Sequence, residues 1–203
     1  FLLLAIPFFV LSGNIMAKAG ISTRLIRFVN TCVGHRKGGI ANVCIIVACF
    51  FGAISGSGPA TVAALGAVLI PAMVERGGFS APFATALMAT ASSIAIVIPP
   101  SIAFVVYASI TGVSIGDMFM AGIVPGILMG LALIVVVMLE VHKNHVVPSN
   151  VQKASAKERL DAFKDAFWGF LMPVIILGGI YGGIFTPTEA AAVSVVYGLF
   201  VGM

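Results

Sequence analysis

Two short stretches of the sequence carry residues that could bind a small ion or an anion. Residues 55–58 read Ser-Gly-Ser-Gly and are followed by Pro59, and residues 99–101 read Pro-Pro-Ser. Gly and Pro in such stretches end one helix and begin the next, which leaves backbone N–H and C=O groups without helical partners. Oxygen atoms are the ligands that hard cations prefer, and helix N-termini favour anions. The two stretches are therefore candidate halves of one binding site.

The oxygen atoms near these breaks define a candidate sodium site. Residues 38–74 and 77–116 contain no Asp, Glu, Lys or Arg, so a cation there would be held by neutral oxygens. Proton coupling normally needs a titratable group at membrane depth, which makes sodium the better hypothesis. The candidate ligands are hydroxyl groups and the carbonyls that end the preceding half-helices: Ser55, Ser57, Ser92 and Ser93, with the backbone carbonyls near Ile54 and Val97.

The starts of the two following helices define a candidate substrate site. A Ser or Gly N-cap followed by Pro in the first turn is typical of a helix start, and each helix N-terminus carries a charge of about +0.5. Two such termini would attract a carboxylate. The candidate substrate-binding residues are Ser57, Gly58, Pro59, Pro99, Pro100 and Ser101. A turn and a kink would explain either stretch alone, but two breaks at matching depth favour a transporter's site.

The composition places these stretches in a membrane protein. Of 203 residues, 60% are hydrophobic and 9% are charged, whereas soluble domains carry about 25% charged residues. The uncharged runs are as long as the roughly 20 residues that a transmembrane helix needs. The sequence therefore predicts an all-α polytopic membrane protein and excludes a soluble domain or a nucleic-acid binder. It contains no ATP-binding loop motif and no nucleophile with a basic partner at membrane depth, so we expect no enzyme.

The spacing of charges and breaks divides the chain into four regions. We predict an apolar helix plus an interfacial amphipathic arm over 1–37, a central unit over 38–139, a cytoplasmic amphipathic linker over 140–168 and further helices over 169–203. The central unit contains a re-entrant helical hairpin (38–75), a broken helix (79–116) and a span (118–139). The hairpin segment has a second interpretation, two full spans, but its arms of 16–17 residues are short for that.

The charged loops predict one orientation in the membrane. Lys and Arg gather in 18–37, at Arg76 and in 140–165, whereas Asp117 and Glu189 stand in short loops without basic residues. Because cytoplasmic loops are enriched in Lys and Arg, the basic segments should lie inside. The chain begins and ends within apolar runs, so we interpret it as a fragment of a longer membrane protein.

Four motifs, in order along the chain, resemble the large membrane subunit of TRAP transporters, the tripartite ATP-independent periplasmic transporters of bacteria and archaea. They are GAISGSGPATVAALG at 52–66, IPPSI at 98–102, AGIVPG at 121–126 and GIFTPTEAAA at 183–192. The resemblance covers essentially the whole chain. It differs from the family's pattern where Ala95-Ile96 replace a frequent Gly-Pro.

The resemblance implies the first half of an inverted-repeat elevator transporter, with 169–203 as the start of the second repeat. It also implies sodium-coupled import, across a bacterial or archaeal inner membrane, of an organic acid such as a C4-dicarboxylate or sialic acid. A periplasmic binding protein would deliver the substrate, a small membrane subunit and membrane lipid would be partners, and no cofactor would be needed. In the family, Ser55, Ser57 and 92–101 match a sodium site. The alternatives are a non-catalytic membrane scaffold subunit and a stand-alone sodium–carboxylate symporter.

Overall fold

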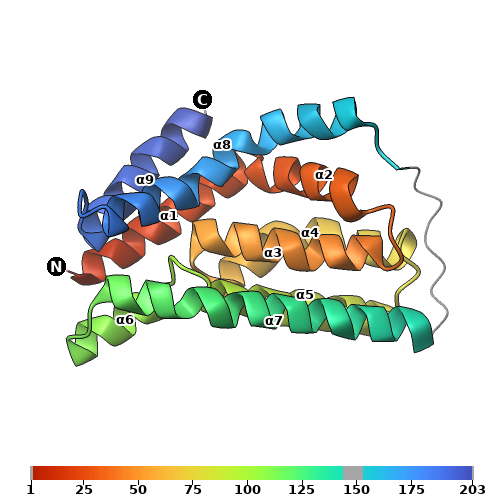
Figure 1. The fold of residues 1–203 in the computed structure, drawn as a ribbon, viewed down its shortest axis with the longest axis horizontal. Helices are drawn as coiled ribbons and strands as arrows, with labels where there is room; N and C mark the ends of the chain where they lie inside the picture. Colours follow the sequence, from red (N-terminus) through yellow and green to blue (C-terminus); the bar gives the residue numbers. More distant parts are fainter. Residues whose placement is uncertain (1, 144–152, 203) are drawn as a thin grey trace.

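The computed structural model describes residues 2–143 and 153–202, and every regular element in these two ranges is a helix. This confirms the predicted all-α class. The elements in chain order are η1 (Leu2–Leu4), α1 (Ala5–Lys18), α2 (Ile21–Val33), α3 (Gly39–Ser55), α4 (Gly58–Glu75), α5 (Ala81–Ser93), η2 (Ile94–Ile96), α6 (Ile102–Thr111), α7 (Ile115–Lys143), α8 (Ala156–Tyr181) and α9 (Pro187–Gly202) (Figure 1).

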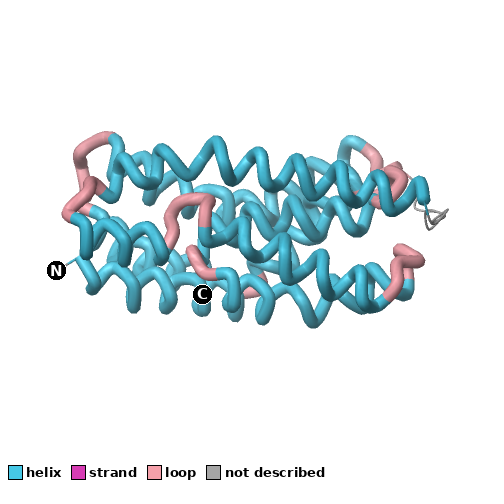
Figure 2. The backbone as a smooth tube through the Cα atoms, turned by 90° about the horizontal axis from the view of Figure 1, so that it is seen from below, coloured by secondary structure: helices cyan, strands magenta, loops and turns pink. Residues whose placement is uncertain are grey.

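Most of these helices run along the long axis of the molecule, as Figures 1 and 2 show from two directions. Within the described ranges, α4, α7 and α8 are long and apolar enough to cross a membrane. A fourth candidate span is formed if the helices over Leu2–Lys18 and Ile21–Val33, which meet at 66°, are counted together. The chain is therefore a polytopic membrane protein, as its composition predicted.

The helices form two groups that meet at α3. Helices α1, α2, α8 and α9 pack on one another in one group, and α3 to α7 make up the other. Helix α3 also contacts α1, α2 and α8 and makes most of the contacts between the two groups, with smaller contacts of α1 to α4 and α6 (Figure 1). Its buried face includes Val43, Val47 and Phe51, each at most 1% exposed.

Helices α3 and α4 form a hairpin with a two-residue turn, as the sequence predicted. Helix α3 ends where Gly56 adopts a φ of 61°, and α4 begins after Ser57, whose hydroxyl accepts a hydrogen bond from the Ala60 N–H. Figure 1 draws the hairpin tip between the two ends of the molecule, not at either end. Helix α6 extends for ten residues, roughly 15 Å, from the level of the hairpin tip toward one end of the molecule. The tip thus lies inside the helical layer, and the re-entrant position of the hairpin in the membrane stays a prediction.

Two segments differ in detail from the predicted division. The amphipathic helix exists as α2, but its buried residues Ile21, Leu25 and Val29 are covered by protein, since α2 packs between α3 and α8. Its position in the membrane interface stays a prediction. The predicted boundary at 168 is not a helix end, because α8 runs without a break from a capping box at Ser155. Part of the predicted linker, residues 144–152, lies outside the described residues.

The basic segments gather at one end of the molecule. The loops after α2 and after α4, the end of α7 and the start of α8 all lie at that end, and the turns before α7 and before α9 lie at the other (Figure 1). Asp117 and Glu189 are in the first turns of α7 and α9. Glu189 accepts a hydrogen bond from the Thr186 N–H at 2.8 Å and so caps the start of α9. The separation of charge by end agrees with the predicted orientation.

Candidate functional site

The hairpin tip and the break in the second helix are joined by a backbone hydrogen bond. The Ile102 N–H, at the first residue of α6, donates to the Gly56 carbonyl at 3.2 Å. The approach is close, because a Cβ added at Gly56 would lie 2.6 Å from the Pro100 carbonyl oxygen. The positive φ of Gly56 also favours glycine at this position. The sequence predicted both breaks, and the structure brings them into direct contact.

Two further glycines bring the end of α5 and its continuation, η2, to the same place. A Cβ at Gly52 would lie 2.7 Å from the Cα of Ala95, and a Cβ at Gly58 would lie 3.1 Å from the Ser92 carbonyl oxygen. The C-termini of α3 and of α5–η2 therefore meet the N-termini of α4 and α6. The carbonyls that end two helices and the N–H groups that begin two others are thus gathered at one junction, which we call the four-ended junction.

Two hydroxyl groups and one backbone carbonyl cluster on the hairpin side of this junction. The Ser55 hydroxyl is 3.2 Å from the Thr61 hydroxyl and donates to the Ser57 carbonyl at 3.3 Å. Thr61 also donates to the Ser57 carbonyl at 2.9 Å. Ser55 and Thr61 are buried, whereas Ser57 is partly exposed. Sequence reasoning missed Thr61, although its position four residues after Ser57 on a new helix places it over the first turn.

The predicted ligands on α5 are close in backbone but differ in their side chains. The Ser92 hydroxyl donates to the Ala89 carbonyl and the Ser93 hydroxyl to the Thr90 carbonyl, each at 2.7 Å. Both hydroxyls therefore bind carbonyls of their own helix. The atom of Ser92 that reaches the hairpin is its backbone carbonyl oxygen, which packs against Gly58.

The Val97 carbonyl, another predicted ligand, faces α7. A Cβ added at Gly122 would lie 2.3 Å from this oxygen and 2.5 Å from the ring of Phe104. One turn further along α7, a Cβ at Gly126 would lie 2.4 Å from the side chain of Ile98. The glycines of α7 thus allow close packing against the unwound stretch of the broken helix.

Ser101 connects the two sides of the break. Its side chain is fully buried, donates a hydrogen bond to the Ile96 carbonyl and accepts one from the Phe104 N–H. It therefore binds the end of η2 and caps the start of α6 with one hydroxyl. Among the other predicted substrate residues, Pro99 and Pro100 are buried and Pro59 is exposed.

Helix α1 closes the junction from a third direction. A Cβ at Gly13 would lie 3.0 Å from the Cα and from the Cβ of Ser55. Beside it, the buried Ser12 hydroxyl donates to the Ser194 carbonyl of α9 at 3.2 Å. The tip is therefore held between the first helix and the broken helix, away from open solvent.

The electrostatics of the junction come from the backbone alone. No Asp, Glu, Lys, Arg or His occurs in residues 38–74 or 77–116. Across residues 2–143 and 153–202, no group of His, Cys, Asp and Glu is arranged to hold a metal ion. The available fields are the positive N-termini of α4 and α6 and the negative C-termini of α3 and η2. Such a junction can hold a carboxylate on its N–H groups and a small cation on its neutral oxygens.

A multi-pass membrane protein whose interrupted helices meet at an uncharged, oxygen-rich junction has the construction of a secondary transporter permease. Comparison with known proteins agrees. The family described as "Tripartite ATP-independent periplasmic transporter, DctM component" matches residues 1–203. The chain belongs to this family of transporter permeases, which are not enzymes. The resemblance seen in the four motifs is confirmed.

Several relatives have named substrates. The chain is 49% identical over 203 residues to the C4-dicarboxylate TRAP transporter large permease protein DctM of Pseudomonas aeruginosa, covering 99% of this chain and 46% of the relative. It is 48% identical to the isethionate permease protein DctMQ of Oleidesulfovibrio alaskensis (100% and 32%). It is 46% identical to the ectoine large permease protein TeaC of Halomonas elongata (96% and 45%). The chain thus spans less than half the length of these relatives.

Proposed function

We propose that this chain is the first half of the membrane subunit of a sodium-coupled importer of an organic acid. The observation that carries the proposal is the four-ended junction, where the Ile102 N–H binds the Gly56 carbonyl at 3.2 Å. A junction of interrupted helices within a membrane protein is the usual construction of an ion and substrate site. The remaining site groups belong to the part of the protein beyond this chain.

Sodium is the coupling ion that the junction fits. The hydroxyls of Ser55 and Thr61 lie 3.2 Å apart beside the Ser57 carbonyl, and the Ser92 carbonyl lies against Gly58. These oxygens are neutral, so they suit a monovalent cation, and no nearby side chain could carry a coupled proton.

The proposed substrate class follows from the helix N-termini at the junction, where the helix dipoles are positive. The N-termini of α4 and α6 are at the junction, and their positive dipole ends favour a carboxylate or another small anion, although the Ile102 N–H is bonded to the Gly56 carbonyl and the Phe104 N–H to Ser101. The named relatives transport a C4-dicarboxylate, isethionate or ectoine, and all three molecules carry an acidic group, which supports an organic acid as substrate.

The partners and location that we propose follow the family description. A separate periplasmic binding protein would deliver the substrate, and a small membrane subunit would complete the permease in the inner membrane of a bacterial or archaeal cell. The junction and α3 to α7 would move together against α1, α2, α8 and α9, as an elevator. The division of the helices into two groups joined through α3 supports this motion.

Two other functions, a membrane scaffold subunit and a stand-alone symporter, differ from this proposal in what they require of the junction and of a binding protein. A membrane scaffold subunit has no need to place irregular backbone inside the helical layer, so the buried junction favours transport. A stand-alone sodium–carboxylate symporter would share the junction but would need no binding protein. Uptake measured with and without the purified binding protein separates it from the tripartite system.

The sodium proposal is tested with Ser57→Ala in the full-length permease. Removing one oxygen ligand should raise the sodium concentration for half-maximal uptake about tenfold, equivalent to about 1.4 kcal/mol. Ser57 is also the N-cap of α4, so a matched control is needed. Ser80 caps α5 in the same way, by accepting from the Phe83 N–H at 3.4 Å, and lies outside the junction. Ser80→Ala should therefore leave the sodium dependence unchanged.

The measurement is uptake into proteoliposomes under a sodium gradient or a proton gradient. The proposal requires uptake with sodium and none with a proton gradient alone. Equal uptake under both gradients, or an equal effect of Ser57→Ala and Ser80→Ala, would contradict it.

A further inference from the structure

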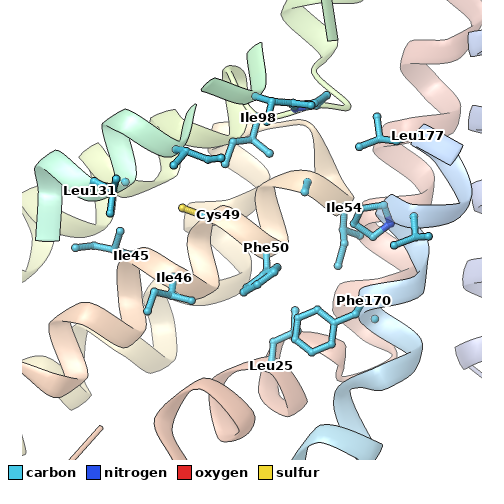
Figure 3. Close-up of a pocket in the computed structure, with 18 of the residues that line it drawn as sticks. Leu25, Ile45, Ile46, Cys49, Phe50, Ile54, Ile98, Leu131, Phe170 and Leu177 are labelled. Atoms are coloured by element: carbon cyan, nitrogen blue, oxygen red, sulfur yellow. The ribbon is translucent and has the colours of Figure 1, made fainter. Parts of the chain in front are cut away.

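An apolar groove of about 620 Å³ runs between the two groups of helices (Figure 3). Its floor is α3, including Ile45 and Ile54, and its walls are α7 and α8. Helices α7 and α8 each pack on α3 but not closely on one another, which leaves the gap. Gly130 and Gly169 are among the residues that line it.

The groove lies where the bilayer is hydrocarbon. Its residues on α7 run from Ile123 to Ile134, the middle of a 29-residue helix whose ends reach the two faces of the molecule. The mouth is formed by Ile127, Leu131 and Val174, which are 53%, 54% and 63% exposed. Because α7 and α8 cross the membrane, this mouth opens toward lipid and not toward water.

The lining excludes a polar occupant. Every lining residue is apolar, and the only side-chain heteroatom among them is the sulfur of Cys49. An apolar cavity stays dry, since water inside it would have no hydrogen-bond partners. A hydrocarbon group is the chemistry that fits.

The small residues over which another membrane helix could approach the groove already pack against other parts of this chain. Membrane helices approach one another over small residues. On α7, Gly126 packs against Ile98 and Gly130 against the Cys49 sulfur, and on α8 Gly169 packs against Ile21. What remains at the mouth is branched aliphatic side chains, the usual surface toward lipid. The groove extends over about 11 residues of α7, roughly 16 Å, close to the roughly 15 Å depth of one leaflet.

We propose that this groove is a binding site for one acyl chain of a membrane lipid, held between the two groups of helices at the depth of the four-ended junction. Ile54 and Ile98, from the hairpin and the break, line its inner end, so the bound chain would contact both interrupted helices (Figure 3). The inference requires that α7 and α8 cross the membrane and that the rest of the permease leaves the groove open to lipid, and it stands whether or not sodium is the coupling ion.

The test uses tryptophan fluorescence in the full-length permease. Trp168 and every other native tryptophan are replaced by Phe, and one reporter is introduced, either Phe50→Trp in the groove or Leu128→Trp as control. Phe50 lines the groove and is 39% exposed, whereas Leu128 is 59% exposed on α7 and does not line it. The protein is reconstituted with phosphatidylcholine brominated on its acyl chains, which quenches nearby tryptophan, and is then exchanged into unbrominated detergent.

We expect both reporters to be quenched in the bilayer and only Phe50→Trp to remain quenched in detergent, because a bound chain is retained. Val174→Trp, on the α8 wall, gives a second groove reporter and should behave like Phe50→Trp. Equal recovery of groove and control reporters would overturn the proposal, since no chain is then held. Failure of both groove reporters to be quenched in the bilayer would also overturn it, because protein then covers the groove.

Discussion

At the scale of single residues, small side chains decide how the junction is built. Gly56 allows the tip to touch Pro100, and Gly58 lets α4 begin against the Ser92 carbonyl. Ser101 uses one hydroxyl to bind both sides of the break. Each of these roles depends on an absent Cβ or a single oxygen atom, so conservative substitutions should have large effects.

Gly56→Ala is expected to abolish uptake. Alanine pays the left-handed penalty of roughly 1–2 kcal/mol, and its Cβ would also meet the Pro100 carbonyl oxygen at 2.6 Å. Gly112→Ala is the matched control, because Gly112 has a φ of 73° with no atom within 4 Å of an added Cβ. Substrate uptake and thermal unfolding of both variants provide the measurement. Equal uptake by the two variants would show that the tip does not need its contact with the break.

Thr61→Val tests the hydroxyl cluster. Valine keeps the shape but loses the hydrogen bonds to Ser55 and to the Ser57 carbonyl, so the ligand oxygens are less well fixed. We expect a rise of about fivefold in the sodium concentration for half-maximal uptake, equivalent to about 1 kcal/mol. Thr85→Val is the control, because the exposed Thr85 hydroxyl binds only its own helix, at the Ala81 carbonyl. A sodium dependence identical in both variants argues against the cluster as part of the ion site.

At the scale of elements, the broken helix depends on its neighbour α7. The unwound stretch contributes the Val97 carbonyl and the Ile98 side chain, and both lie against glycines of α7. A straight helix would need no such support, since its backbone groups bind one another. Gly122 and Gly126 of α7 therefore help to keep the stretch between η2 and α6 unwound.

Gly122→Ala should disturb this support. Its Cβ would meet the Val97 oxygen at 2.3 Å and the Phe104 ring at 2.5 Å, so α7 or the break must shift. We expect lost uptake with the protein still inserted and folded. Gly116→Ala, on the same helix with its nearest atom at 3.6 Å, should transport normally. Uptake by detergent-stable preparations of each variant checks this, and normal uptake by Gly122→Ala would mean that the break needs no contact with α7.

The helix boundaries show which parts of the structure could be predicted from the sequence and which could not. Pro, Gly and Ser at 55–59 and 99–101 predicted both breaks, because these residues act locally on the backbone. The bond between Ile102 and Gly56 could not be predicted, since it joins residues far apart in the chain. The unbroken α8 was also missed, because a change from polar to apolar residues at 168 alters the environment of a helix without ending it.

At the scale of the whole molecule, charge separates the two ends while the junction stays neutral between them. This arrangement predicts that the loop after α2 faces the cytoplasm and the turn before α7 faces the other side. In a cysteine-free full-length permease, Lys37→Cys should react with a membrane-impermeant maleimide only in inverted vesicles, and Val113→Cys only in intact cells. Both positions are exposed. Labelling of Lys37→Cys in intact cells would reverse the orientation.

The backbone bond between Ile102 and Gly56 has a consequence for local unfolding. The Ile102 amide hydrogen can exchange with solvent only when the hairpin tip separates from the break. Opening of either helix interruption should then expose the other, so the two should exchange as one cooperative unit. An ion or substrate bound to the junction would slow that exchange at once on both segments, and a single amide would report the occupancy of the site.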